Sequence, residues 1–170
     1  MRTKINGMIL QFLVACVFLV SASHVHAWGI KELETEKVAV SLVREVERGG
    51  YKIVSTEELK KWMDEKKSML IVDTMPFESS YKKNHIPDAV QFELPIAEMK
   101  TIEPAKKAEL ERLLGIDKNR LVVFYCGFTK CTRSHNGAMW AAKLGYRNVY
   151  RQPGGINAWK EAEYPVQNVK

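Results

Sequence analysis

The sequence predicts an α/β domain in which helices pack on a parallel β-sheet. From Tyr51 onward, short apolar runs alternate with helix-length segments, which is the pattern of strand–helix units in a parallel sheet. The run LVVFY at 121–125 is the most apolar of them, so we place it at the centre of the sheet. The chain has 170 residues, of which 46% are hydrophobic and 27% charged, and this is enough for one domain with a real core.

The first 27 residues have the pattern of an export signal. A cationic head, MRTKING, precedes the stretch MILQFLVACVFLVSAS, which is shorter than the roughly 20 residues of a membrane span. The small residues of VHA, which ends at Ala27, fit a signal peptidase site. We expect residues 1–27 to be a cleaved signal peptide and the protein to be exported, to the periplasm in a bacterium.

Two alternatives keep the N-terminus on a membrane. The apolar segment can remain as an anchor, or Cys16 can carry a lipid, because LVAC resembles a bacterial lipobox. The apolar run continues past Cys16, which counts against lipidation. Contact with a membrane is expected only in these two cases, and cleavage after Ala27 would leave Cys126 and Cys131 as the cysteines of the mature chain.

The predicted elements follow in order along the chain. Residues 28–50 are charged and helical up to the pair Gly49–Gly50, and we interpret them as an N-terminal helical extension packed on a domain that comprises residues 51–170. Ser55 and Glu58 form a capping box that begins the first helix of the domain. The apolar face of that helix carries Leu59, Trp62 and Met63. The predicted strands are 51–54, 69–74, 89–94, 121–125 and 148–152, and the later helices are 103–115, 134–144 and 155–163.

Cys126 follows the strand that we place at the centre. Parallel sheets bind ligands beyond the carboxyl ends of their strands, so this thiol is in the place where the architecture carries chemistry. An ordinary cysteine is only about 3% ionised at pH 7, and lowering its pKa to about 6.5 requires roughly 2.7 kcal/mol. We predict that this stabilisation of the thiolate comes from the N-terminus of the 134–144 helix, the charges of Lys130 and Arg133 and the amides of the loop. We therefore predict a Cys126 thiolate in a ring of main-chain amides; the alternative is a small buried hydrophobe.

Charge and ligand patterns restrict the partners. The formal net charge is +6, but the lysines are scattered among glutamates and form no basic stripe with aromatic residues, so no nucleic acid is expected. A mildly basic surface favours small anionic substrates. Cys126, Cys131 and His135 lack the nearby fourth ligand of a closed zinc site, so we expect no metal. No organic cofactor is expected either.

Four stretches in this order resemble a single rhodanese domain, from about residue 51 to residue 166. They are LIVDTMPFESSYKKNHIPDAVQFELP, VVFYCGFTKCTRS, AAKLGYRNVY and QPGGINAWKEAEYPV. The first resembles the family's strand and His-Ile-Pro-Gly-Ala turn, the second its active-site loop, and the last its Gly-Gly-x-x-Ala-Trp signature. The resemblance implies a rhodanese-like α/β fold, with a five-stranded parallel sheet flanked by helices on both faces.

The resemblance also implies a sulfurtransferase. Cys126 would take a sulfane sulfur as a persulfide and pass it to a thiophilic acceptor such as a thiol. The implied donors are small anionic sulfur compounds, thiosulfate or polysulfide, or a protein persulfide. The loop would cradle the persulfide and the incoming anion through Gly127, Phe128, Thr129, Lys130, Cys131, Thr132 and Arg133.

Three departures from the family pattern separate this chain from its relatives. Asp88 replaces the usual Gly of the turn, and Thr74 and Met75 stand where the family has an Arg. The loop places six residues, GFTKCT, between Cys126 and Arg133, where the family has four. Related phosphatases of the same fold have five before an Arg that grips phosphate, so a phosphatase or an arsenate reductase is a rival class.

The role of Cys131 has several alternatives. It can attack an oxidised or persulfidated Cys126 and make the domain a dithiol redox protein, it can be a second sulfur-handling thiol, or it can be a spectator facing solvent. A non-enzymatic rhodanese-like module that binds or senses is a third function class, with residues 28–50 as its docking element. Asp73 is expected to anchor a neighbouring loop, and His85 to bond to backbone in a turn.

Overall fold

The structure is a computed structural model and describes residues 31–169. The predicted signal peptide at 1–27, with Cys16, lies outside the described residues. The chain divides into two units, with the boundary between Lys37 and Val38. Within residues 31–169, no helix combines the length and the apolar character that a membrane crossing requires.

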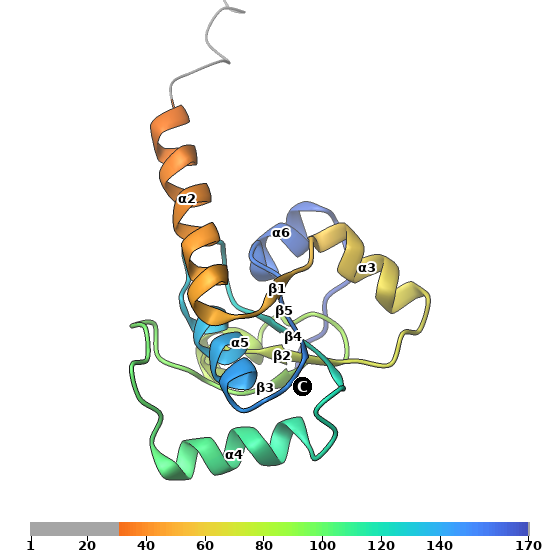
Figure 1. The fold of residues 1–170 in the computed structure, drawn as a ribbon. Helices are drawn as coiled ribbons and strands as arrows, with labels where there is room; N and C mark the ends of the chain where they lie inside the picture. Colours follow the sequence, from red (N-terminus) through yellow and green to blue (C-terminus); the bar gives the residue numbers. More distant parts are fainter. Residues whose placement is uncertain (1–30, 170) are drawn as a thin grey trace, which may run out of the picture. The chain divides into compact units, whose positions relative to one another are not determined.

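A five-stranded sheet, all parallel, forms the centre of the second unit, in the order β1-β5-β4-β2-β3 (Figure 1). The strands are β1 (Lys52–Ile53), β2 (Leu70–Asp73), β3 (Val90–Gln91), β4 (Leu121–Tyr125) and β5 (Asn148–Arg151). The predicted α/β class is confirmed, and β4 is the central strand as predicted. Its residues 122–125 are fully buried, because strands pair with both of its edges and helices cover both faces.

Helices cover both faces of the sheet and create two apolar cores. They are α3 (Thr56–Asp64), α4 (Pro104–Leu114), α5 (Arg133–Lys143) and α6 (Gly155–Glu161). On one face α4 and α5 bury Leu110, Leu114 and Met139 against the strands. On the other face Leu59 of α3 and Trp159 of α6 form the second core. A parallel sheet needs this double cover because the side chains of its inner strands are apolar on both sides.

Local signals in the sequence set the helix boundaries. The side chain of Ser55 accepts a hydrogen bond from the Glu58 amide at 3.1 Å, and the Glu58 carboxylate accepts one from the Ser55 amide at 2.9 Å, which confirms the predicted capping box. Helix α4 begins at Pro104 and ends before Gly115, whose φ of 79° lies in the left-handed region. Helix α5 begins at Arg133, one residue earlier than predicted.

Helix α2 (Glu32–Gly49) occupies most of the predicted extension and ends at the glycine pair. In the second unit, Val46 packs against the core that α5 also covers. Gly49 is buried where a Cβ would collide with the ring of Tyr51. The last turns of α2 therefore pack closely on the domain, and they bring Glu45 and Arg48 to the region beyond the carboxyl end of β4.

Candidate active site

The Cys126 loop, residues 126–132, connects β4 to α5 and is anchored first by α6. The carbonyl of Cys126 accepts from the Ile156 amide at 2.8 Å, and that of Gly127 accepts from the Asn157 amide at 3.1 Å. Gly155 makes this approach possible, because its φ is 65° and a Cβ there would lie closer than 3.0 Å to the backbone of Cys126 and Gly127. The glycine pair of the last motif thus fixes where the loop begins.

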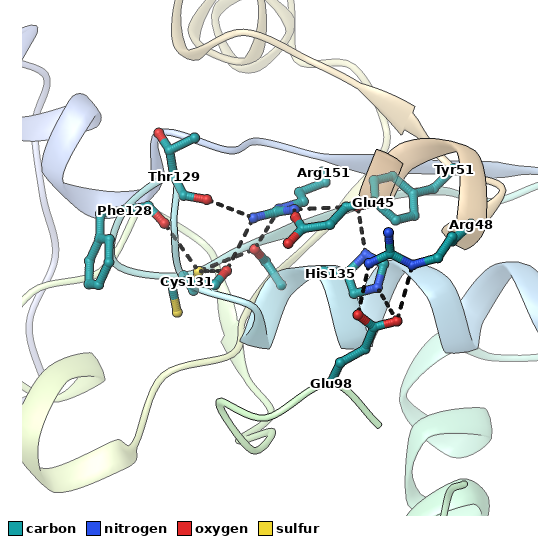
Figure 2. Close-up of polar contacts among 11 residues, drawn as sticks. Glu45, Arg48, Tyr51, Glu98, Phe128, Thr129, Cys131, His135 and Arg151 are labelled. Atoms are coloured by element: carbon teal, nitrogen blue, oxygen red, sulfur yellow. Dashed lines mark hydrogen bonds and ion pairs between the residues drawn. The ribbon is translucent and has the colours of Figure 1, made fainter. Parts of the chain in front are cut away.

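Arg151, the last residue of β5, holds the rest of the loop through hydrogen bonds of its side chain. Its guanidinium is fully buried and donates to the carbonyls of Thr129 at 3.0 Å and Cys131 at 3.1 Å (Figure 2). It also donates from Nε to the Ser134 hydroxyl at 3.0 Å. One planar group therefore binds two carbonyls of the loop and the first turn of α5, which suits the five fixed donors of arginine.

The buried charge of Arg151 is compensated by the last turns of α2. The Glu45 carboxylate accepts from Nη1 of Arg151, and the Tyr51 hydroxyl lies 3.3 Å from the same nitrogen. Figure 2 shows Glu45 and Tyr51 beside the guanidinium. Burying an unpaired guanidinium would cost several kcal/mol, so the ion pair is a condition for this loop arrangement. We did not predict Arg151 from the sequence, although a charged residue inside the strand pattern NVYRQ is a usable signal.

A second set of polar contacts begins at the Tyr51 hydroxyl. The Nδ1 atom of His135 lies 2.8 Å from the Tyr51 hydroxyl, and Nε2 lies 3.6 Å from the carboxylate of Glu98, which also pairs with Arg48 at 2.8 Å. His135 is thus engaged away from the two cysteines. Among residues 31–169, no group of three or more His, Cys, Asp or Glu side chains is placed to hold a metal.

Cys126 is fully buried at the end of β4, and its sulfur faces oxygen atoms. Sγ lies 3.2 Å from the carbonyl oxygen of Cys131, 3.8 Å from that of Phe128 and 3.2 Å from the Ser134 hydroxyl. A carbonyl can only accept, so these contacts favour the protonated thiol as donor. Burial, and next the neighbouring Cys131 thiol, raise the pKa of Cys126 well above its ordinary value, while contacts with Ser134 act in the opposite direction.

The predicted amide ring around a low-pKa Cys126 is therefore wrong. The physical reason is Arg151, which draws the carbonyls of Thr129 and Cys131 into the loop, so that the Cys131 carbonyl meets the sulfur. The N–H of Ser134 is the backbone donor that lowers the pKa of Cys126, and it is outweighed by burial. A buried anion surrounded by carbonyl oxygens would be destabilised twice, by desolvation and by the dipoles.

Cys131 lies in the opposite environment. Its side chain is buried, with a 2% exposed fraction for the residue, so it is not a spectator facing solvent. Hydrogen bonding with the Cys126 side chain is the largest of the effects that lower the pKa of Cys131 to about 6, and the amides of Arg133 and Gly127 act in the same direction, against the opposing effect of burial. Of the two thiols, Cys131 is therefore the one whose pKa is lowered.

The other residues of the predicted cradle are divided between surface and interior. Phe128 is 47% exposed, and Lys130 is also exposed. Arg133 donates to the carbonyl of Leu94 and lies 3.8 Å from the Glu93 carboxylate. Its guanidinium is thus engaged with the segment after β3.

Asp73, Thr74 and His85 form hydrogen bonds with nearby backbone groups. Oδ1 of Asp73 accepts from the Met75 amide at 2.8 Å, and burial raises the pKa of this carboxyl. The Thr74 hydroxyl donates to the carbonyl of Tyr125 at 2.8 Å and so ties β2 to the end of β4. Nδ1 of His85 lies 2.8 Å from a backbone carbonyl, which confirms it as a turn histidine.

Comparison with known proteins decides the family. A model described as a rhodanese-like domain matches residues 55–162. The chain belongs to the rhodanese-like family. The matched residues contain β2, β4, the Cys126 loop and α6, whereas Glu45 and Tyr51, which contact the Arg151 guanidinium, precede them. The interpretation as a rhodanese-like fold is confirmed.

Solved structures show the same fold. A thiosulfate sulfurtransferase from Pseudomonas aeruginosa matches with a TM-score of 0.57 at 22% identity, over 78% of this chain and 23% of that one. A polysulfide-sulfur transferase homodimer from Wolinella succinogenes matches with a TM-score of 0.55 at 13% identity, over 82% and 93%. A Bacillus halodurans protein matches with a TM-score of 0.54 at 20% identity, over 77% and 87%. Among curated proteins, no sequence matches this chain.

Proposed function

We propose that this rhodanese-like protein is an exported sulfurtransferase or sulfane-sulfur carrier in which Cys126 bears the persulfide. The observation that carries the proposal is the position of Cys126 at the carboxyl end of β4, where its sulfur lies 3.2 Å from the carbonyl oxygen of Cys131. Burial and hydrogen bonding between the two side chains raise the pKa of Cys126, and the same hydrogen bonding lowers the pKa of Cys131. A nucleophile hydrogen-bonded to a base is the arrangement that covalent catalysis requires.

Cys131 acts as the proton acceptor in the first step. The Cys126 sulfur attacks the outer sulfur of thiosulfate, its proton passes to the Cys131 thiolate, and the bond to the sulfonate breaks, which releases sulfite. The product is a persulfide on Cys126, and no electrons are exchanged with any third reagent. Polysulfide or a protein persulfide reacts in the same way, with a shorter polysulfide or a thiol as leaving group.

The surroundings fit small anionic donors and a thiol acceptor. Lys130 is exposed on the loop, and the chain carries a formal net charge of +6, both of which favour approach of an anion. Export follows from the pattern of residues 1–27, and a membrane is involved only if that segment is retained or lipidated. A phosphatase is not favoured, because Arg133 is engaged with the Leu94 carbonyl instead of the loop.

Mass spectrometry tests the proposal. The reduced full-length Cys131→Ser variant, incubated with thiosulfate or polysulfide and then desalted, should form an adduct that contains one added sulfur atom, and peptide mapping should locate this atom on Cys126. A Cys126→Ser variant should remain unmodified. Absence of added sulfur from every form, or equal modification of the Cys126→Ser variant, would refute a persulfide on this residue.

A further inference from the structure

We propose that Cys131 resolves the persulfide on Cys126, releasing hydrosulfide and closing a Cys126–Cys131 disulfide, so that the loop reduces sulfane sulfur instead of only carrying it. The inference rests on the proposed function, because it begins from the persulfide. It adds a product, hydrosulfide, and a required partner, an external dithiol that reduces the loop again.

The position of Cys131 selects the atom that is attacked. In the resting protein Cys126 Sγ is fully buried and lies 3.2 Å from the carbonyl oxygen of Cys131. The two side chains also shift each other's pKa in opposite directions, upward at Cys126 and downward at Cys131. After persulfide formation this Sγ is the inner sulfur of the pair, so Cys131 already lies against the inner sulfur.

The stability of the leaving group also favours attack on the inner sulfur. Attack on the outer sulfur would expel Cys126 as a thiolate, next to the carbonyls of Cys131 and Phe128, where negative charge is disfavoured. Attack on the inner sulfur expels hydrosulfide, a good leaving group that does not leave a charge on Cys126. The loop therefore favours disulfide closure over transfer of the sulfur from one cysteine to the other.

The nucleophile is prepared by the backbone. Besides hydrogen bonding with Cys126, the amides of Arg133 and Gly127 and the charge of Arg133 lower the pKa of Cys131, and they remain in place after Cys126 has lost its S–H, so Cys131 can return its proton to solvent before it attacks. Arg151 holds the carbonyls of Thr129 and Cys131, which fixes the backbone of Cys131 beside Cys126 Sγ. This fixed proximity replaces a chance encounter between two thiols.

Atoms and electrons balance in each step. The Cys131 thiolate forms a bond to Cys126 Sγ as the bond between the two persulfide sulfurs breaks with its electron pair on the leaving hydrosulfide. The sulfane sulfur is reduced to sulfide, and the two cysteines are oxidised to a disulfide. A dithiol then restores both thiols by two exchange steps and becomes a disulfide itself.

The test combines released sulfide with peptide mapping on the full-length chain. Reduced and desalted wild-type protein, given thiosulfate without oxygen, should release one burst of sulfide and lose the mass of two hydrogen atoms, with a disulfide linking the peptides of Cys126 and Cys131. Added dithiothreitol should convert the burst into continuous release. The Cys131→Ser variant should acquire its persulfide more slowly, keep it, and release no sulfide above a protein-free control.

Matched variants separate the possible results. Cys16→Ser should behave as wild type, which excludes the third cysteine of the sequence as the resolving thiol. A wild-type protein that keeps the added sulfur on Cys126 with Cys131 free would overturn this inference and leave the proposed function standing. A persulfide found on Cys131, or wild-type sulfide release from Cys131→Ser or Cys131→Ala, would also overturn it. If no form takes up sulfur, the proposed function fails as well.

Discussion

The two ends of the Cys126 loop place chemically identical side chains in opposite environments. At one end Cys126 faces carbonyl oxygens and its pKa is raised, and at the other the amides of Arg133 and Gly127 help to lower the pKa of Cys131. Both residues are buried, so desolvation acts against the charged form at both. The difference comes from the interaction between the two side chains together with the direction of the peptide groups around each of them.

The largest expected effect comes from Arg151, which sets the direction of those peptide groups. Arg151→Met should lower the free energy of unfolding by about 3–5 kcal/mol, because Glu45 loses its partner and loop carbonyls lose their donor. Urea unfolding measures this. Arg147→Met removes an exposed arginine near the start of the same strand and should change stability by less than about 0.5 kcal/mol. Equal effects of the two variants would contradict the role assigned to Arg151.

Gly155 tests whether the loop needs its anchor on α6. Gly155→Ala should cost about 2–4 kcal/mol, from a left-handed backbone and from a collision with the backbone of Cys126 and Gly127. Gly145→Ala is the matched control, because its φ is 89° but nothing lies within 4 Å of the added methyl. It should cost only about 1–2 kcal/mol. Similar unfolding midpoints for the two variants would show that the close approach at Gly155 is not needed.

A thiolate titration addresses the comparison directly. The ultraviolet absorbance of the reduced protein should show one thiolate that ionises with a pKa of about 6, and Cys131→Ser should lack this transition. In Cys126→Ala the pKa of Cys131 should rise, because the side-chain hydrogen bond that lowers it most is lost. If Cys131→Ser keeps a transition at this pH, the assignment of the two thiols is reversed.

Protein stability should follow the same titration. The folded pKa of Cys131 lies below the ordinary value of 9.0, so its contribution is present above that pH and is lost as the pH falls to about 6. The raised pKa of Cys126 has the opposite sign: its contribution is present at lower pH and is lost in alkaline solution. Urea unfolding of wild type should gain stability between about pH 6 and 9 relative to Cys131→Ser, and parallel curves would contradict this.

The smallest expected effect is that of the Ser134 hydroxyl, which touches both Cys126 and Arg151. Ser134→Ala should cost about 1–2 kcal/mol, since one N–H of the guanidinium is left without an acceptor. Because contacts with Ser134 lower the pKa of Cys126, its loss should raise that pKa further. The alkaline part of the absorbance titration shows this shift, and a downward shift would be inconsistent with the described contacts.

Most of the fold was predictable because its signals are local. Apolar runs located the strands, LVVFY was recognised as the central one, and Ser55 with Glu58 marked a helix start that the structure confirms. Four motifs in order predicted the rhodanese-like family. The position of Cys126 at the carboxyl end of β4 followed from the same pattern. These features depend on residues close together in the chain, where periodicity and capping have a direct physical basis.

The environment of the two thiols was not predictable in this way. The sequence by itself determined a sheet with cysteines at the end of its central strand, because hydrophobic patterning is enough to order the strands. Only the tertiary structure decided which sulfur has the lowered pKa. Arg151 comes from β5 and Glu45 from α2, far from the loop in sequence, and together they turn its carbonyls inward. Peptide direction depends on such distant partners, because each buried carbonyl must find a donor wherever the fold supplies one.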